Sequence, residues 1–309
     1  MNRHYAYLYD DFLSDKAYER ALANIETRCS VLGIQGRTAR LAIFRSARDL
    51  VEGLVKDGAE TIVVVGNDRS LQKVMWFLPD LPVTVGYIPV CEPSSIGMML
   101  GIPLGDRGCD VLAARRMETL DMGTIDDRYF LTEVVMDATK ASVDVEGHYR
   151  IAPRQAGTVS VRNLGGMSKD GRSNADARDG LLEVVVKPYV EAPKKNGFSR
   201  ILSTFSPQAA RAVRSAGMSE TRLTLSKGAI VSDEPIDMLV DGHPINGFRF
   251  RIGIVPRKLK IITGRDKRLD PQAATDAATI PPVLPKSPVA ATVPATTKQT
   301  HGWRNWYTR

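Results

Sequence analysis

The segment Thr61–Val74 constrains the fold of this 309-residue chain more than any other. It begins with an apolar run, Thr61–Val65, breaks at Gly66 into a short polar loop, and continues as an amphipathic helix. An apolar strand that leads through such a turn into a helix is typical of a parallel sheet buried on both faces. The turn also places backbone N–H groups and a helix N-terminus where an anion can bind.

The first 120 residues or so repeat this alternation of strand and helix. One helix begins at Ser46 with a variant of the capping box, Ser46-x-x-Asp49. The alternation predicts a parallel sheet with helices on both faces. We expect, in chain order, His4–Tyr9 (strand), Ser14–Leu32 (helix), about Leu41–Phe44 (strand), Ser46–Lys56 (helix), Thr61–Val65 (strand), a helix to about Phe77, and Val83–Val90 (strand).

From about Leu120 the pattern changes to short runs of alternating apolar and polar residues, with one helix expected near Pro207–Val213. Strands at this spacing predict an antiparallel sandwich or barrel. We therefore predict an α/β domain over residues 1–120, a β-sandwich domain over 121–264 and a disordered Pro-, Ala- and Thr-rich tail over 265–309. The expected strands are Arg128–Val135, Ser142–Glu146, Thr158–Val161, Leu181–Lys187, Thr221–Leu225, Met238–Val240, Phe248–Val255 and Leu259–Thr263.

Charge and composition bear on partners and location. A net charge of +7 favours polyanionic partners such as an anionic membrane or a nucleotide, or serves solubility alone. Trp303 and Trp306 near the C-terminus suit a membrane interface, a peptide-docking motif or an end that folds back on the protein. Three cysteines without metal-ligand spacing fit a reducing compartment. We expect a cytoplasmic protein, at most peripheral to a membrane, with no nucleic-acid partner. The sequence leaves open whether the chain forms a homodimer.

Several segments resemble one known family. The loop Gly66-Asn67-Asp68-Arg69-Ser70 is similar to the strand–GGDGT–helix element of the diacylglycerol kinase and sphingosine kinase family, relatives of NAD kinase. The resemblance covers most of residues 1–264 and implies an α/β nucleotide-binding domain followed by a β domain. The other matching segments, in the family's order and spacing, are Pro89–Pro103, Val161–Asn163, Asp176–Val184 and Val240–Pro244.

The resemblance implies ATP and Mg²⁺ as cofactors of this loop. By it, Gly66 lets the backbone approach the phosphates, Asn67 belongs to the same ATP-binding loop, Asp68 orients Mg²⁺, and Ser70 offers its hydroxyl to a phosphate. Arg69 replaces a glycine of the family, and its guanidinium would either clamp a phosphate or block the loop. The residues alone leave an alternative, in which Asp68 is the N-cap of the following helix.

The resemblance also assigns roles to the second half of the chain. Asp241 matches the general base that acts on the lipid hydroxyl, and His243, two residues further along a strand, would lie on the same face. The alternative is that Asp241 begins an Asp-Gly hairpin turn. Asp176, Asp179 and the carbonyl of Leu181 match a structural Mg²⁺ site, and such oxygen ligands suit that ion. A solvated turn is the alternative for these residues.

Three segments depart from the family pattern where the phosphates would bind. The loop after Val65 has lost two glycines, the first strand ends in Asp10 and Asp11, and Glu92-Pro93 falls in the second glycine-rich segment. The carboxylates of these segments would come near the triphosphate and repel it. Two like unit charges about 4 Å apart repel by roughly 4 kcal/mol at an effective dielectric of ~20. The sequence therefore leaves open a lipid kinase at an anionic membrane surface, an inactive descendant that acts as a binding or regulatory module, and a relative with a new small ligand between its domains.

Overall fold

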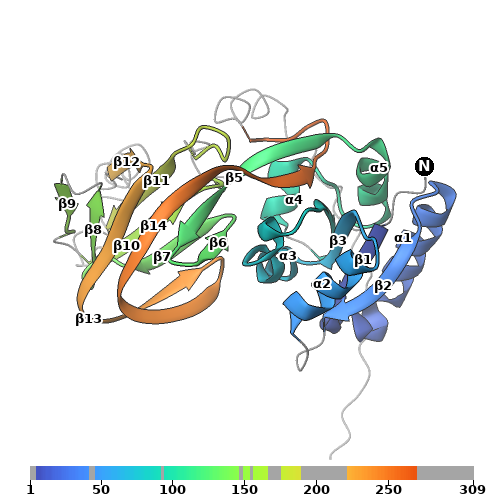
Figure 1. Ribbon diagram of the computed structural model, residues 1–309, viewed down its shortest axis with the longest axis horizontal. Coiled ribbons are helices and arrows are strands. Elements are labelled where there is room, and N and C mark those ends of the chain that lie inside the picture. The colour runs from blue at the N-terminus through green and yellow to red at the C-terminus, as the bar shows by residue number, and fades with distance from the viewer. Residues whose placement is uncertain are drawn as a thin grey trace, which may run out of the picture.

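The computed structural model describes residues 5–41, 46–91, 94–145, 149–153, 156–165, 175–188 and 221–269. In these ranges helices alternate with strands first, and strands alone follow (Figure 1). The helix expected near Pro207–Val213 and most of the expected tail lie outside the described residues. Among the helices of the described ranges, none combines the length and the hydropathy needed to cross a bilayer.

The chain from Tyr5 to Ala114, called the α/β region below, builds a parallel sheet with the strand order β2-β1-β3-β4. Every residue of β3 and of β4 is buried, as the apolar run after Thr61 predicts. The elements are β1 (Tyr5–Asp10), α1 (Glu19–Val31), β2 (Gly36–Leu41), α2 (Ala47–Lys56), β3 (Thr61–Gly66), α3 (Asp68–Met75), β4 (Thr84–Pro89), α4 (Ser95–Leu100) and α5 (Asp106–Ala114), with 3-10 turns at Asp11–Ser14, Lys16–Tyr18 and Leu78–Asp80.

Both faces of this sheet carry helices. Successive side chains of a strand point to opposite faces, so Leu8 of β1 packs in one core cluster with Leu71 of α3. Tyr7 points to the other face and packs with Ile25 of α1 and Cys109 of α5. The parallel sheet covered on two sides agrees with the prediction from strand–helix alternation.

The chain from Met117 to Ile262, called the β region below, consists of strands and their connections in its described part. Its strands pair antiparallel with one another and enclose a second core cluster, in which Phe130, Val184 and Ile230 are fully buried. The strands are β5 (Met117–Ile125), β6 (Arg128–Phe130), β7 (Glu133–Asp137), β8 (Ser142–Val145), β9 (Tyr149–Ile151), β10 (Gly157–Arg162), β11 (Leu182–Pro188), β12 (Thr221–Leu225), β13 (Lys227–Val240) and β14 (His243–Ile262).

The long strand β14 belongs to both regions. It pairs with β13 at its start and with β5 along the rest of its length, and near its end Ile261 lies opposite Val85 of β4 in parallel. The register with β5 shifts between Val255 and Leu259, where Arg257 has a φ of 54°. An irregularity of this kind bends a strand, and Figure 1 shows β14 crossing from the β region to the α/β region.

Some elements differ from the prediction for physical reasons. The strand expected at about Leu41–Phe44 falls mostly on residues outside the described ranges, and only Leu41 of it lies in β2. The strand β2 begins earlier, at Gly36; it is the edge of the sheet and mostly exposed, so it needs no apolar pattern. The runs Phe248–Val255 and Leu259–Thr263 are parts of one strand, and Arg128–Val135 divides into β6 and β7. Neither α4, α5 nor β5 was predicted from the sequence.

Candidate functional site

The loop before α3 is closed by a capping box between Asn67 and Ser70. Asn67 Oδ1 accepts the Ser70 N–H at 3.0 Å, and Ser70 Oγ accepts the Asn67 N–H at 3.0 Å. Ser70 is fully buried, and a Cβ added at Gly66 would lie only 2.7 Å from Ser70 Cβ. Gly66 therefore makes room for the serine, whose hydroxyl is engaged inside the helix start. Since Asn67 is the N-cap, the alternative prediction that Asp68 is the N-cap is wrong.

Asp68 reaches across to the start of α4 instead. Its Oδ1 accepts the hydroxyls of Tyr87 at 2.9 Å and Ser94 at 2.7 Å. Its Oδ2 accepts the backbone N–H groups of Ser95 at 2.7 Å and Ile96 at 3.1 Å. Helix starts favour a negative charge at their unpaired N–H groups. The Asp68 carboxylate thus binds α3 to α4 within the α/β region.

These four donors account for the acceptor capacity of Asp68. An ionised carboxylate offers about four lone-pair positions, and each is taken by a protein donor. Tyr87 is fully buried, and the pKa of its hydroxyl is raised first by burial and then by the neighbouring Asp68 charge, so it stays a donor. In this arrangement both oxygens of Asp68 are engaged by protein donors.

The surroundings of the loop carry further charge. Arg69 is exposed on the first turn of α3. Asp10 accepts the N–H of Asp11 at 2.7 Å, and its Cβ would lie 3.5 Å from a Cβ added at Gly66, so a second carboxylate stands beside the loop. Glu92 and Pro93 lie outside the described residues.

Asp241 forms the turn between β13 and β14. Val240 and His243 pair across this two-residue turn, and Asp241 and Gly242 have φ values of 48° and 75°. Positive φ at both central residues is the geometry that an Asp-Gly hairpin prefers, so the hairpin alternative is confirmed. His243 is the first residue of β14.

The Asp241 side chain is buried and points into the protein. Its Oδ2 accepts the Leu131 N–H at 2.7 Å, and its Oδ1 accepts the N–H groups of Thr132 at 2.8 Å and Glu133 at 3.1 Å and the Thr132 hydroxyl. Burial raises the pKa of Asp241, and the hydrogen bonds from Thr132 and the backbone oppose the rise. With 1% of its surface exposed, this carboxylate holds the connection between β6 and β7 in place.

One face of α3 contacts the β region and forms the seam between the two regions. Gln72 Nε2 donates to Thr132 Oγ1 at 3.0 Å, and Thr132 donates in turn to Asp241. Trp76 packs edge-on against His243, with ring centroids 5.1 Å apart, and the Arg128 guanidinium lies 4.6 Å from the Trp76 ring centroid. The structure therefore links the helix that starts at Asp68 to the Asp241 turn through one turn of α3.

The residues predicted as a Mg²⁺ site lie in the connection before β11. Both carboxylate oxygens of Asp176 accept the Arg178 guanidinium, at 2.8 and 2.9 Å, and Asp179 Oδ1 accepts the Leu181 N–H at 2.8 Å. Burial raises the pKa of Asp179, and the charges of Asp176 and Asp121 add to the rise. In the described ranges no three carboxylate, imidazole or thiol side chains converge on one point as metal ligands. The pairing of Asp176 with an arginine favours the turn alternative.

Two further residues join this turn to the seam: Asp121, which sequence reasoning missed, and Asn163, which it found only as part of the matching segment Val161–Asn163, without a role. Asp121 is buried and accepts the N–H groups of Gly180 at 2.8 Å and Arg257 at 2.7 Å. Asn163 Nδ2 donates to the carbonyls of Asp121 and Leu131. Sequence reasoning also missed Gln72 and Trp76. The signal that could have found them is their spacing, since Arg69, Gln72 and Trp76 recur on one helix face.

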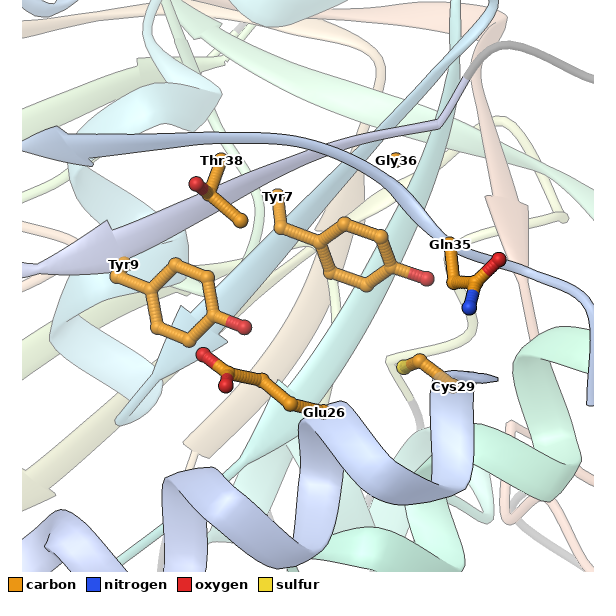
Figure 2. A pocket seen from close by; sticks show the side chains of 7 residues that line it. All are labelled: Tyr7, Tyr9, Glu26, Cys29, Gln35, Gly36 and Thr38. Atoms are coloured by element: carbon orange, nitrogen blue, oxygen red, sulfur yellow. The ribbon is translucent and has the colours of Figure 1, made fainter. Parts of the chain in front are cut away.

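Two cavities lie away from this seam, between α1 and the edge strand β2. One has a volume of about 110 Å³ and is lined by Tyr7, Tyr9, Glu26, Cys29, Gln35, Gly36 and Thr38 (Figure 2). The neighbouring one has a volume of about 280 Å³ and shares Tyr9, Glu26 and Thr38 with the first. Neither includes a residue that the sequence predicts to bind nucleotide, metal or lipid.

Comparison with known proteins identifies the fold. No protein-family model matches this sequence, and no curated protein matches it. Among solved structures, a diacylglycerol kinase from Bacillus anthracis strain Sterne aligns over 86% of this chain and 98% of its own, with a TM-score of 0.62 and 13% identity. A candidate diacylglycerol kinase of the same strain aligns over 86% of this chain and 96% of its own, with a TM-score of 0.64 and 12% identity. The chain thus has the diacylglycerol-kinase-like fold that its segments predicted.

Proposed function

We propose that this protein is a divergent member of the diacylglycerol kinase family that has kept the fold without phosphoryl transfer and acts as a binding or regulatory module. The observation that carries the proposal is the engagement of Asp68, whose two oxygens accept four hydrogen bonds from Tyr87, Ser94, Ser95 and Ile96. A carboxylate that serves Mg²⁺ needs free lone pairs. Here the lone pairs hold α3 and α4 together.

The other motif residues support the same proposal. Ser70 is buried in the capping box, so a phosphate has no access to its hydroxyl. Asp241 is buried under Leu131–Glu133, and a general base must lie within hydrogen-bond reach of the proton that it takes. Each residue that matches a catalytic role therefore has a structural role, which explains how it persists where the glycines around it are lost.

An ATP-dependent lipid kinase is the second candidate function. One observation favours it: Gln72, Thr132 and Asp241 form a hydrogen-bonded chain from α3 to the β13–β14 turn. A movement at this seam would alter the surroundings of Asp68 and Asp241 together. In that case the acceptor would be a lipid hydroxyl at an anionic membrane surface, as the family resemblance implies.

Phosphoryl transfer to lipid distinguishes the two candidates. The full chain is incubated with radiolabelled MgATP and vesicles of phosphatidylglycerol that contain diacylglycerol, beside the Asp68→Asn variant. The proposal predicts the same background of labelled lipid for both proteins. Labelled lipid that forms with the wild type, and falls at least tenfold in a folded Asp68→Asn variant, would establish the kinase instead.

A further inference from the structure

Two of the three cysteines lie side by side although they are far apart in the sequence. Cys29 of α1 and Cys109 of α5 are 80 positions apart, and their Sγ atoms are 3.6 Å from each other. The two helices cover the same face of the parallel sheet (Figure 1). Both thiols are free. Because a disulfide has an S–S length of about 2.05 Å, a shift of roughly 1.5 Å would bring these sulfurs to bonding distance.

The two thiols differ in their access to small molecules. Cys109 is completely buried, and its Sγ contacts the Ile25 carbonyl oxygen at 3.8 Å. Cys29 is 5% exposed and lines the cavity of about 110 Å³ beside β2, where Figure 2 shows it near Tyr7 and Gln35. A small oxidant that enters this cavity would therefore meet Cys29 first, with Cys109 directly behind it.

The pKa values of the two thiols also differ, and the difference favours reaction at Cys29 as the difference in access does. The hydrogen bond with Cys109 lowers the pKa of Cys29 to about 7, against burial, with help from Tyr7 and opposition from Glu26. The pKa of Cys109 is raised by the same hydrogen bond and by burial, and the charges of Asp106 and Asp110 add to the rise. Cys29, which lines the cavity and has the lowered pKa, is thus the better nucleophile of the pair.

We propose that Cys29 and Cys109 are an oxidisable pair that a small peroxide converts into an intramolecular disulfide between α1 and α5. The Cys29 thiolate attacks one oxygen of hydrogen peroxide, the O–O bond breaks, and a sulfenic acid and hydroxide form. Cys109 sulfur then attacks Cys29 sulfur, the S–O bond breaks, and its hydroxyl leaves as water as the Cys109 proton is taken up. Two thiols and one peroxide give one disulfide and two waters, and the peroxide accepts both electrons.

Peptide mapping under non-reducing conditions tests the proposal on the full chain. Trypsin cleaves after Arg28, Arg37, Arg107 and Arg115, so the disulfide would join peptide 29–37 to peptide 108–115. The Cys91→Ser variant is the matched control, since Cys91 contacts the Tyr18 hydroxyl and not this pair. The joined peptide is expected in wild type and in Cys91→Ser after treatment with hydrogen peroxide, and not in Cys29→Ser or Cys109→Ala.

A pH series and a thermal measurement complete the test. The rate of peptide joining should rise with the fraction of thiolate as the pH increases through about 7. The oxidised protein should unfold several degrees higher than the reduced protein, because the bond closes a long loop of the unfolded chain. Peroxide treatment that oxidises Cys29 only to sulfinic acid, or a joined peptide that forms equally fast in urea, would overturn the proposal.

Discussion

The start of α3 and the turn between β13 and β14 each place a carboxylate that accepts hydrogen bonds from the protein, but the donors come from different parts of the chain. Each holds one acidic residue, Asp68 or Asp241, and each carboxylate accepts four hydrogen bonds from the protein. Asp68 takes its donors from residues 19 to 28 positions away, inside the α/β region. Asp241 takes its donors from residues 108 to 110 positions away and is almost wholly buried. The first carboxylate joins two helices within the α/β region, and the second joins the β13–β14 turn to the β6–β7 connection.

Under the proposed function, this difference shows how residues that match a family motif can serve the fold alone. A carboxylate that caps a helix start and one that closes a hairpin onto another strand both stabilise the fold without a ligand. The identity of the residue is then kept, while nearby positions such as Arg69 are free to depart from the family pattern. Stability measurements can sharpen the comparison, because the buried contacts of Asp241 should cost more to remove than the partly exposed contacts of Asp68.

The largest effect is expected for Asp241→Ala. It leaves the N–H groups of Leu131, Thr132 and Glu133, the first of them buried, without their acceptor. We expect the free energy of unfolding, measured by urea denaturation, to fall by about 4 kcal/mol. Asp241→Asn keeps one acceptor oxygen and tolerates the positive φ, so it should lose about half as much. Equal stability of Asp241→Ala and wild type would contradict the anchoring role.

A smaller loss is expected for Asp68→Ala. Asp68 is only partly buried, so water replaces part of what the carboxylate provided to Ser95 and Ile96. We expect unfolding to become easier by about 2–3 kcal/mol. Arg69→Ala changes an exposed neighbour on the same helical turn and should stay within about 0.5 kcal/mol of wild type. If Asp68→Ala cost no more than Arg69→Ala, the proposed role of Asp68 would fail.

Glycine substitutions provide a test with opposite signs. Gly66→Ala forces a Cβ against Ser70 and should destabilise the protein by about 2 kcal/mol. Gly53→Ala, inside α2, meets no atom within 4 Å and should stabilise it by about 0.5–1 kcal/mol. Chemical denaturation of both variants checks the pair, and a neutral Gly66→Ala would mean that Ser70 is not held as described.

The smallest effect is expected at the seam. Gln72→Ala removes one neutral hydrogen bond, to Thr132 Oγ1, and should cost about 1 kcal/mol. Lys73→Ala, at the exposed next position of α3, serves as the control and should be within about 0.5 kcal/mol of wild type. The difference between the thermal unfolding midpoints of the two variants measures the contribution of the seam contact. Equal midpoints would contradict the proposed link between α3 and Asp241.

Local signals in the sequence predicted local structure well. The Ser46 cap is confirmed, since Ser46 Oγ accepts the Asp49 N–H at 3.3 Å, and so is the Asp241-Gly242 turn. Both depend on residues close together in the chain. The first five residues of β2 were not predicted as strand because an exposed edge strand carries no apolar alternation. The two final runs were separated because the bend at Arg257 interrupts the pattern of a single strand.

The candidate site was harder to predict because its contacts are tertiary. Asp68 could be singled out from its motif, but its partner Tyr87 comes from β4, and no spacing rule connects the two. The donors to Asp241 come from the β6–β7 connection, which the sequence pattern runs together as one strand. Cys29 and Cys109 likewise meet only because α1 and α5 cover the same face of the sheet.

Isothermal titration calorimetry of MgATP into the full chain tests the central claim most directly. Asp68 is engaged with the start of α4 and Ser70 with Asn67, so we predict no binding heat at millimolar MgATP. The Arg69→Gly variant, which restores a glycine of the family pattern, should also give no binding heat, because the capping box and the Asp68 contacts remain. Micromolar binding by wild type that disappears in a folded Asp68→Asn variant would contradict the account.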